Sequence, residues 1–364
     1  MSETRHNWTK EDILEIYNTP LMDLLYNAAT IHRKHHDPNT VQVSTLLSIK
    51  TGGCPEDCGY CPQAARYHTD IEGNDLMSVQ HVKAQALRAK SSGSSRICMG
   101  AAWRNVKDGE EFDQVLEMVR TINKLDMEVC CTLGMITENQ AQRLAEAGLY
   151  AYNHNLDSSE EYYKEVISTR GYEDRLETID NVRKTNVTVC SGGIIGMGEN
   201  AEDRAGMLVA LSTLNPQPES VPINALVAVE GTPLEDQKPV SIWDMIRMVA
   251  TTRIVMPETQ VRLSAGRTEM TREGQAMCFF AGANSIFAGD KLLTTPNPDV
   301  NADMEMFKML GLNPQKPFIK KMQPETVEAQ DSQYQALGEK PKWTRPEHKI
   351  ERNEEAKQKA KVLK

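Results

Sequence analysis

The stretch from Lys50 to Ala65, KTGGCPEDCGYCPQAA, organises the chain because it gathers three cysteines on one glycine-rich loop. Cys54, Cys58 and Cys61 follow a C-x3-C-x2-C spacing. The glycines and prolines around them let the backbone curl, so the three thiolates can converge on one metal centre. Three thiolates leave one iron of a cubane 4Fe-4S cluster without a protein ligand, and that open iron can bind a small molecule.

Two other interpretations of the loop remain open. The cysteines could form half of a structural zinc site, or they could be three ordinary thiols. A structural zinc site needs a fourth Cys or His, and His68 is the one candidate within a few residues. No pattern around His68 marks it as a ligand. The spacing by itself fits either kind of metal site.

Charge and cysteine usage narrow the class of protein. The 364 residues suit one large domain or two small ones, and the net charge of −10 comes without a basic stripe. Nucleic acid and anionic membranes are therefore not expected as partners. The first residues are polar, and no later apolar run approaches transmembrane length. We expect a cytoplasmic protein, in which cysteines serve metals or catalysis more often than disulfides.

From Val41 onward, apolar segments alternate with helical patterns. Eight segments are predicted as strands: VQVSTLLSIK, SRICMGAA, EVCCTLGM, YAYNHNLD, VTVCSGGIIGM, VPINALVAV, VRLSAG and NSIFAG. Eight strands alternating with helices over about 250 residues predict an α/β fold, a (β/α)8 TIM-type barrel. A doubly wound open sheet is the alternative, but no G-x-G-x-x-G motif follows the first strand. The cysteine loop then follows the first strand, at the barrel end where chemistry is located.

The two ends of the chain differ from this repeating part. Residues 1–40 are predicted as an N-terminal helical extension, with an amphipathic helix from Thr9 to Arg33 that caps one end of the barrel. Residues 41–318 form the predicted barrel. Residues 319–364 are rich in charge and poor in large apolar side chains, which predicts a disordered or partly helical tail.

Two local patterns lead to structural predictions. The charged run HRKHH, which contains three histidines, predicts a solvated helix face rather than a metal site: His32, His35 and His36. Two residue pairs are predicted as N-terminal capping boxes of helices: Thr137 with Gln140, and Ser158 with Glu161.

Four of the predicted strands carry a residue that is unusual inside a barrel. They are Cys98, Cys190, Arg262 and one of the adjacent pair Cys130 and Cys131. A single cysteine on a strand is most often a small packed residue, but three on different strands, with a buried arginine, could hold a second iron–sulfur cluster. Adjacent strand residues face opposite ways, so only one of Cys130 and Cys131 points inward. Composition does not choose between them.

Polar side chains end the fourth predicted strand, in YNHNLD. Asn153, Asn155 and Asp157 share one face by the strand period of two. Two amides and a carboxylate suit hydrogen bonds to a ribose diol and a urea ring. The structural alternative is a capped strand end, with Asp157 serving the next helix. His154, on the other face, is predicted as a satisfied structural histidine rather than a base.

A glycine-rich turn follows the fifth predicted strand and has the pattern G-x-I-x-G-x-x-E. Its defining residues are Gly192, Ile194, Gly196 and Glu199. The glycines allow a ligand to approach the backbone closely, although such strand ends are common. Arg96 lies two residues before Cys98 and therefore on the same strand face, where it could orient or neutralise a ligand.

These motifs resemble the radical S-adenosylmethionine (radical SAM) superfamily and, within it, the biotin synthase family. The resemblance runs from roughly Leu14 to Phe318 and is carried by TGGCPEDCGYCPQAA, RICMGAAWR, CTLG, YNHNLD, CSGGIIGMGE, INALVAVEGTPLE, VRLSAGR and AGANSIF. It implies a sulfurtransferase that inserts sulfur into dethiobiotin to form biotin, the last step of biotin biosynthesis. In that family a 5′-deoxyadenosyl radical removes hydrogen from dethiobiotin, and a 2Fe-2S cluster donates the sulfur.

The resemblance assigns roles to the candidate residues. The 4Fe-4S ligands would be Cys54, Cys58 and Cys61, and the 2Fe-2S ligands Cys98, Cys130, Cys190 and Arg262. Cys130 is preferred because the ligand in that family is followed by one residue and then by T-L-G. Cys131 is an alternative ligand. S-adenosylmethionine would contact Tyr60, Asn155, Asp157, Gly192, Ile194, Gly196 and Glu199, and dethiobiotin would contact Asn153 and Asn224. No acid–base residue is expected, and Cys278 matches no ligand position and is expected to pack in its helix.

The resemblance also implies a flavodoxin- or ferredoxin-type electron donor and a homodimer. Two alternative functions stay open. One is another radical enzyme, such as lipoyl synthase or a radical lyase, although lipoyl synthase should carry a further cysteine motif before Cys54 and none is present. The strand cysteines and Arg262 argue against a generic lyase. The other is a non-catalytic iron–sulfur carrier or sensor, which has no need of an open iron.

Overall fold

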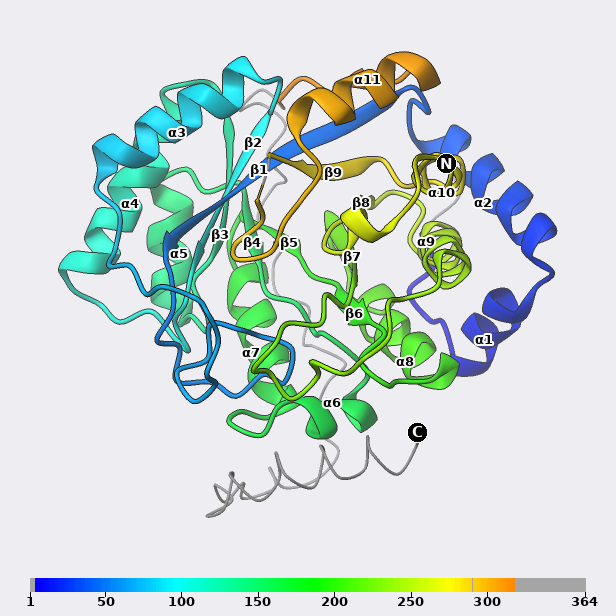
Figure 1. Ribbon diagram of the computed structural model, residues 1–364, viewed down its shortest axis with the longest axis horizontal. Coiled ribbons are helices and arrows are strands. Elements are labelled where there is room, and N and C mark those ends of the chain that lie inside the picture. Colours follow the sequence, from blue (N-terminus) through cyan, green and yellow to red (C-terminus); the bar gives the residue numbers. More distant parts are fainter. Residues whose placement is uncertain (1–3, 290, 318–364) are drawn as a thin grey trace.

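The computed structural model describes residues 4–289 and 291–317, and it contains a closed barrel of parallel strands surrounded by helices (Figure 1). Hydrogen-bonded neighbours follow the order β1-β2-β3-β4-β5-β7-β8-β9, and β9 pairs with β1. That pairing closes the barrel, so the predicted (β/α)8 fold is confirmed. Two short strands lie off this ring: β6 pairs with β7, and β10 pairs with the start of β1.

The strands are β1 Thr40–Lys50, β2 Arg96–Ala101, β3 Glu128–Thr132, β4 Ala151–Asn153, β5 Thr188–Cys190, β6 Gly193–Ile195, β7 Ser220–Ala225, β8 Gln260–Leu263, β9 Ser285–Ala288 and β10 Asn313–Pro314. The helices are α1 Lys10–Asn18, α2 Leu21–His35, α3 Val79–Ser91, α4 Glu110–Asn123, α5 Glu138–Glu146, α6 Glu160–Val166, α7 Tyr172–Arg183, α8 Ala201–Ser212, α9 Ile242–Val255, α10 Arg272–Phe280 and α11 Val300–Leu310. A short 3-10 turn, η1, covers Arg267–Glu269.

The fifth predicted strand is divided in two. β5 pairs with β7 through one residue pair, Cys190 with Ser220, and β6 then continues along β7 from Gly193. The chain approaches β7 most closely at Gly192, where a Cβ atom would lie 2.1 Å from the carbonyl oxygen of Pro222. Only glycine fits there, so the strand is interrupted where the backbones come together.

The N-terminal extension consists of two helices rather than one. Pro20 precedes α2 and separates it from α1, because proline has no N–H to donate and its ring clashes with the preceding helical turn. α1 packs against α8 and α2 against α9, so the pair adds a second layer outside that side of the barrel (Figure 1). The boundaries proposed at residues 40 and 318 stay predictions, and the predicted tail lies outside the described residues.

Strand alternation divides the buried residues into two groups. The larger core lies between the strands and the helices and includes Met99 and Cys131. A much smaller group lies inside the barrel and includes Cys98, Cys130 and Cys190. The barrel interior is therefore built around sulfur atoms and polar groups instead of the branched aliphatic layers that usually fill such a barrel.

Two local predictions are wrong and one is confirmed. The HRKHH run is not a solvated face, because His32 is buried and His36 bonds the Arg253 guanidinium at 2.8 Å. The capping box predicted for Ser158 with Glu161 is not formed, because the N-cap of α6 is Ser159, whose hydroxyl accepts the N–H of Tyr162. The capping box at Thr137 is present as predicted.

Within the described residues, no helix is both long enough and apolar enough to cross a membrane.

The buried histidines make acid stability a test of this packing. Burial lowers the pKa of His32 to about 3, with help from the nearby charge of Arg253. The unfolded chain takes up a proton near pH 6.5 and the folded chain does not, so stability is present above that pH and falls as the pH drops toward 4. His32→Leu should weaken this loss by about 1 kcal/mol per pH unit below 6.5. Urea unfolding of both proteins at pH 7.5 and 5.5 measures the difference, and equal losses would contradict the assignment.

Candidate functional site

The three-cysteine loop leaves the C-terminal end of β1 and folds back on itself. Cys54 donates its N–H to the Gln63 carbonyl at 3.0 Å, and Ala65 donates to the Cys54 carbonyl at 2.8 Å. Gly52 and Gly53 have φ angles of 75° and 71°, in the left-handed region that glycine adopts without strain. These turns bring the loop over the barrel mouth, at the end where the sequence predicted it.

Two acidic residues inside the cysteine motif fasten the loop to the segment after α6. The Asp57 carboxylate accepts hydrogen bonds from the backbone N–H groups of Ser168 and Thr169, both at 2.9 Å. The Thr169 hydroxyl also donates to both Asp57 and Glu56. Arg104 donates to the Thr169 carbonyl at 2.6 Å and lies 3.4 Å from a Glu56 oxygen. Sequence analysis missed this clamp, because no pattern near the acidic residues marks Thr169 as their partner.

The loop thiols need a positively charged group to ionise. Burial raises the pKa of Cys58 to about 11 and that of Cys61 to about 12, and the nearby Cys58 and Cys54 add to the second shift. Arg170 is buried close enough to Cys58 to oppose its shift. The Arg170 Nε atom has no hydrogen-bond partner among the described residues. A spare buried donor near Cys54 and Cys58 fits an anionic iron–sulfur cluster at this place.

The second set of thiols lies deeper, inside the barrel. The parallel register sets Cys98 of β2 opposite Cys130 of β3, and it sets Cys190 of β5 beside β4 and β7. Cys130 shares hydrogen bonds with both Cys98 and Cys190. Cys131 faces the other way, into the main core, where burial raises its pKa above the usual range. The structure thus gathers Cys130, not Cys131, with the other two thiols.

Arg262 joins this set from β8. Its Nη1 atom lies 3.8 Å from the Cys190 sulfur, while Nε and Nη2 donate to Ser285 and Gln42, each at 2.8 Å. A hydrogen bond from Cys130, supported by the Arg262 charge, lowers the pKa of Cys190 to about 6. Three converging thiols and a fully buried guanidinium suit an anionic cluster with thiolate ligands.

Neither set forms a site for a single ion. Among the described residues, no three Cys, His, Asp or Glu side chains form a group that could hold one metal ion. A cluster is larger than an ion, and its ligands stand farther apart. The fit of the thiols to a cluster therefore rests on their convergence, burial and neighbouring guanidinium groups.

Amide groups connect the strand thiols to the barrel mouth. Asn153, at the end of β4, donates to the Cys190 sulfur at 3.3 Å and to the Asn155 side-chain oxygen at 3.0 Å. Thr132 donates to the Asn153 oxygen at 3.1 Å, and Asn155 accepts the N–H of Gly192 at 3.2 Å. Asn153 and Asn155 are both half-buried, so they face the interior without being enclosed.

Asp157 is placed differently from the prediction. The strand ends at Asn153, so the period of two does not extend to Asp157, whose φ angle of 69° is unusual for a residue other than glycine. The Asp157 carboxylate is buried and accepts hydrogen bonds from Tyr60, at 2.6 Å, and from Arg175. It does not cap the following helix, because Ser159 does. Sequence analysis missed Arg175, whose only signal was its place in an ordinary helical pattern.

His154, predicted to be a satisfied structural histidine, is buried but not satisfied. Its Nε2 atom has no hydrogen-bond partner among the described residues. Burial lowers its pKa well below the usual range, and the positive charges of Arg175 and Arg170 act in the same direction. A buried neutral imidazole whose ring lies 6.4 Å from that of Tyr152, a residue of the main core, supports a structural role.

The remaining predicted contacts lie on β6, β7 and the turn after β6. Asn224 donates to the Gly193 carbonyl at 2.9 Å and accepts the Ala265 N–H at 3.1 Å, so it ties β6 to the segment after β8. Ile194 is the residue of β6 that pairs with Asn224, and it is partly exposed. Gly192 and Gly193 press against β7 and the Asp157 backbone, which leaves no room for a Cβ atom.

Glu199 shapes the turn that contains Gly196. Its carboxylate accepts the N–H groups of Gly196 and Met197, at 2.9 and 2.8 Å, and binds Arg204 at 2.9 Å. The Glu199 side chain is only 1% exposed, so its oxygens are directed to its own turn. Cys278 is buried in α10 within the main core, as expected for a packing residue.

Two family models match the chain. Residues 48–211 match the Radical SAM superfamily, and residues 222–313 match the Biotin and Thiamin Synthesis associated domain. The first match contains the cysteine loop and the strand thiols, and the second contains Asn224 and Arg262. A parallel barrel whose first strand leads into such a loop, and which matches this superfamily, defines a radical SAM enzyme.

Comparison with individual proteins narrows this class. The chain is 87% identical to the biotin synthase of Christiangramia forsetii over 358 residues, covering 98% of this chain and 99% of that protein. It is 65% identical to the biotin synthase of Cytophaga hutchinsonii, over 87% of this chain and 94% of that protein. The chain belongs to the biotin synthase family. It is thus a sulfurtransferase that uses S-adenosylmethionine, a 4Fe-4S cluster and a 2Fe-2S cluster.

Solved structures agree on the fold. The crystal structure of methylornithine synthase aligns with a TM-score of 0.72 at 17% identity, covering 85% of this chain and 94% of that one. The FeFe-hydrogenase maturase HydG from Carboxydothermus hydrogenoformans aligns with a TM-score of 0.70 at 16% identity, over 85% of this chain and 76% of that one.

The orientation of β3 predicts different effects for two adjacent cysteines. Cys130→Ala should remove the iron and sulfide of the second cluster, because it deletes the thiol shared between Cys98 and Cys190. Cys131→Ala should keep both clusters and cost about 1 kcal/mol of stability from a lost core atom. Iron and sulfide content with visible absorption of the two reconstituted variants measures this. Retention of the second cluster in Cys130→Ala and its loss in Cys131→Ala would reverse the assignment.

Proposed function

We propose that this chain inserts sulfur into dethiobiotin within the barrel interior, between the three-cysteine loop and the strand thiols. The observation that carries this proposal is the group formed by Cys98, Cys130, Cys190 and Arg262. It lies inside the barrel and is linked through Asn153 to the mouth. A sulfur source placed beneath the substrate position, with a radical source above it, suits a reaction that forms carbon–sulfur bonds.

The two clusters and S-adenosylmethionine supply electron transfer, radical hydrogen removal and sulfur, which no side chain could provide. The chain's own residues hold these groups and order them in space. Cys54, Cys58 and Cys61 are the proposed ligands of the 4Fe-4S cluster. The clamp on Asp57 fixes the loop that carries them, so the geometry of the three thiols does not depend on a mobile surface segment.

The proposed S-adenosylmethionine contacts surround the mouth. Tyr60 and Arg175 converge on Asp157 and hold its carboxylate in one orientation, which suits a carboxylate that accepts hydrogen bonds from a ribose diol. Asn155, two residues before Asp157, is the second proposed contact, and its amide N–H groups would donate to the same ligand. Gly192, Ile194 and Gly196 provide close backbone approach, and Glu199 contributes by holding the turn rather than by direct contact.

The proposed dethiobiotin contacts are Asn153 and Asn224. Each side chain is half-buried, and each carries both a donor and an acceptor, as a urea ring requires. Asn153 also contacts the Cys190 sulfur, so it lies between the proposed substrate position and the proposed sulfur source. Binding at this depth keeps the reacting carbon away from water.

The test is an anaerobic reaction of the reconstituted protein with dethiobiotin, S-adenosylmethionine and a reductant. Mass spectrometry should find biotin and 5′-deoxyadenosine together. Deoxyadenosine without biotin would reject either the substrate or the sulfur-donor role of the second cluster. If neither product forms while the 4Fe-4S spectrum is intact, the protein acts as an iron–sulfur carrier.

The remaining partner assignments are also proposals. A flavodoxin- or ferredoxin-type protein is the proposed electron donor, because Cys54, Cys58 and Cys61 lie at the barrel mouth and a 4Fe-4S cluster held there would need one electron at a time. The proposed location is the cytoplasm, where eight free cysteines stay reduced. The proposed assembly is a homodimer.

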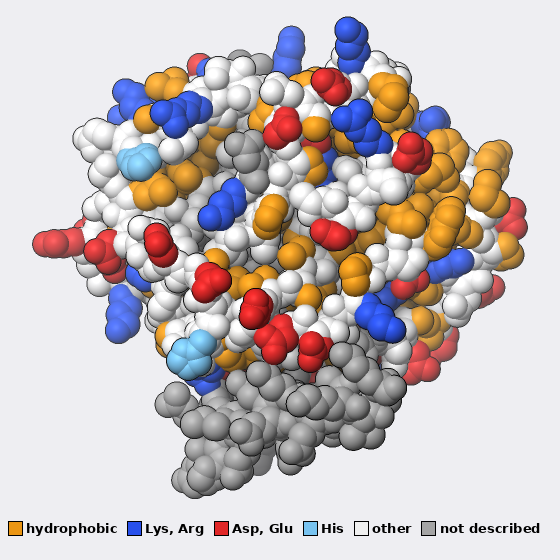
Figure 2. All heavy atoms as spheres, viewed as in Figure 1, with side chains coloured by type: hydrophobic (Ala, Val, Ile, Leu, Met, Phe, Trp, Pro, Cys, Tyr) orange, Lys and Arg blue, Asp and Glu red, His pale blue; other side chains and the backbone are white. Residues whose placement is uncertain are grey.

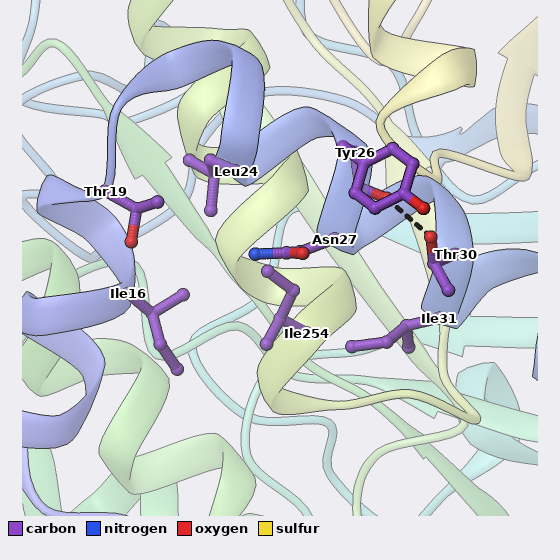
Figure 3. Close-up of a pocket in the computed structure, with 8 residues that line it drawn as sticks. All are labelled: Ile16, Thr19, Leu24, Tyr26, Asn27, Thr30, Ile31 and Ile254. Carbon is purple, nitrogen blue, oxygen red and sulfur yellow. Dashed lines mark hydrogen bonds between the residues drawn. The ribbon is translucent and has the colours of Figure 1, made fainter.

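An apolar surface on α2 supports the homodimer. Figure 3 shows a groove where α1, α2 and α9 meet, lined by Ile16, Thr19, Leu24, Tyr26, Asn27, Thr30, Ile31 and Ile254. Met22 and Tyr26 on α2 are 73% and 71% exposed, which is unusual for large apolar side chains. Figure 2 shows further hydrophobic side chains gathered on this side of the molecule.

The dimer prediction is tested by one charge on this surface. Tyr26→Glu should convert a dimer into a monomer in light scattering, because a buried unpaired carboxylate opposes association. Leu87→Glu is the matched control, since Leu87 is an exposed apolar residue on α3, and it should remain dimeric. A monomeric parent protein, or a dimeric Tyr26→Glu variant, would contradict the assignment.

A further inference from the structure

A charged bridge lies in the barrel below the strand thiols. Arg96 opens β2, Glu128 opens β3, and Glu219 immediately precedes β7. All three positions are at the N-terminal ends of parallel strands, so they lie at the floor of the barrel, opposite the mouth. Arg96 is two residues before Cys98 and shares its inward face.

The bridge spans the interior from one wall to the other. The Arg96 Nε atom donates to Glu128 at 2.7 Å, while Nη1 and Nη2 donate to the two oxygens of Glu219 at 3.0 and 2.8 Å. In the closed ring, four pairings separate β2 from β7 on either side, so the two strands face each other. A bidentate pair between opposite walls closes the lumen as a crossbar.

Burial decreases from the centre of the bridge toward the outside. The side chain of Arg96 is 0% exposed, that of Glu128 4%, and that of Glu219 16%. The Tyr150 ring packs 4.8 Å from the Arg96 guanidinium. Glu219 is thus the member that faces solvent, and Arg96 is the member that faces the thiols.

Some polar side chains at the same level of the barrel have no hydrogen-bond partner among the described residues. Ser44 lies in register with Arg96, and Ser220 lies in register with Gln260. One side-chain oxygen of each of these three residues, Ser44, Ser220 and Gln260, is buried without a hydrogen-bond partner in the described chain. Unpartnered buried polar groups bind water wherever there is room for it, so the layer around the crossbar is polar rather than apolar.

Energetics argue against a purely structural crossbar. Removing a guanidinium and two carboxylates from water is costly, and apolar residues of similar volume would stabilise a barrel floor at least as well. The main core shows that the chain has apolar side chains elsewhere on the same strands. A charged closure differs from an apolar plug in that water and small ions can pass when it opens.

We propose that the Arg96–Glu219 pair is a seal that controls the exchange of small ions between solvent and the strand thiols through the barrel floor. This inference rests on the proposed function, because it takes Cys98, Cys130 and Cys190 as ligands of the second cluster. Ferrous iron and hydrosulfide are the ions concerned, and an added chelator traps iron that has left through the floor. Neither Arg96 nor Glu219 is assigned a contact with the substrate, so neither is a catalytic residue.

The test compares cluster loss in four proteins under anaerobic conditions. Glu219→Ala removes the partly exposed half of the seal and leaves every strand residue in place. Added chelator should bleach the second cluster faster in this variant, on the order of tenfold, because hydrogen bonds to charged groups hold the closed state. Bleaching of the 4Fe-4S cluster and 5′-deoxyadenosine formation should match the parent protein. Glu219→Gln keeps one acceptor oxygen for Arg96 and loses the second acceptor and the charge, so it should restore only part of the slow rate.

Asp303→Ala is the matched control. It breaks another buried arginine–carboxylate pair, Arg267 with Asp303, which lies between η1 and α11 outside the barrel. This control should lose stability but keep the parent rate of cluster loss. Equal rates in Glu219→Ala and the parent, or equal acceleration in Asp303→Ala, would overturn the seal.

A second measurement separates this proposal from the proposed function. Peptide mass analysis after exposure to a small thiol reagent, methyl methanethiosulfonate, reports the access to Cys98, Cys130 and Cys190 in the full chain. Faster modification in Glu219→Ala supports the seal even if no biotin forms. Unchanged modification together with biotin formation would reject the seal and keep the function.

Discussion

The closure of the parallel barrel, with one residue in two facing inward, is the constraint on which the site depends. Because β2, β3, β5 and β8 are held in a fixed register, Cys98, Cys130 and Cys190 meet at one level with Arg262. The shift of one residue would turn each thiol into the outer core, where Cys131 already lies. A buried set of thiols is thus obtained from backbone pairing alone, without a dedicated metal-binding loop.

The side chains at the mouth of the barrel are positioned in a different way. Its functional side chains lie on loops, and they are placed by side-chain hydrogen bonds instead of strand pairing. Asp57 holds the cysteine loop through Ser168 and Thr169, while Tyr60 and Arg175 fix Asp157. The buried set at the centre and the clamped set at the mouth are joined by Asn153, the last residue of β4.

The sequence was a good guide to whatever depends on periodicity. Eight apolar segments at regular spacing predicted the barrel, and strand alternation predicted that only one of Cys130 and Cys131 could face inward. Periodicity failed where the strand ended: Asp157 left the predicted face because β4 stops at Asn153. Contacts between distant segments, such as Asp57 with Thr169 and Arg96 with Glu219, have no local signature, and a helical pattern did not reveal that Arg175 or His32 is buried.

The division of the fifth strand gives its two halves different neighbours. β5 has three residue pairs with β4 and one, Cys190 with Ser220, with β7, whereas β6 has three pairs with β7. The segment that carries a thiol and the segment that leads into the glycine-rich turn are thus anchored to different strands, although only two residues separate them. One stretch of chain in this way serves both the interior of the barrel and its rim.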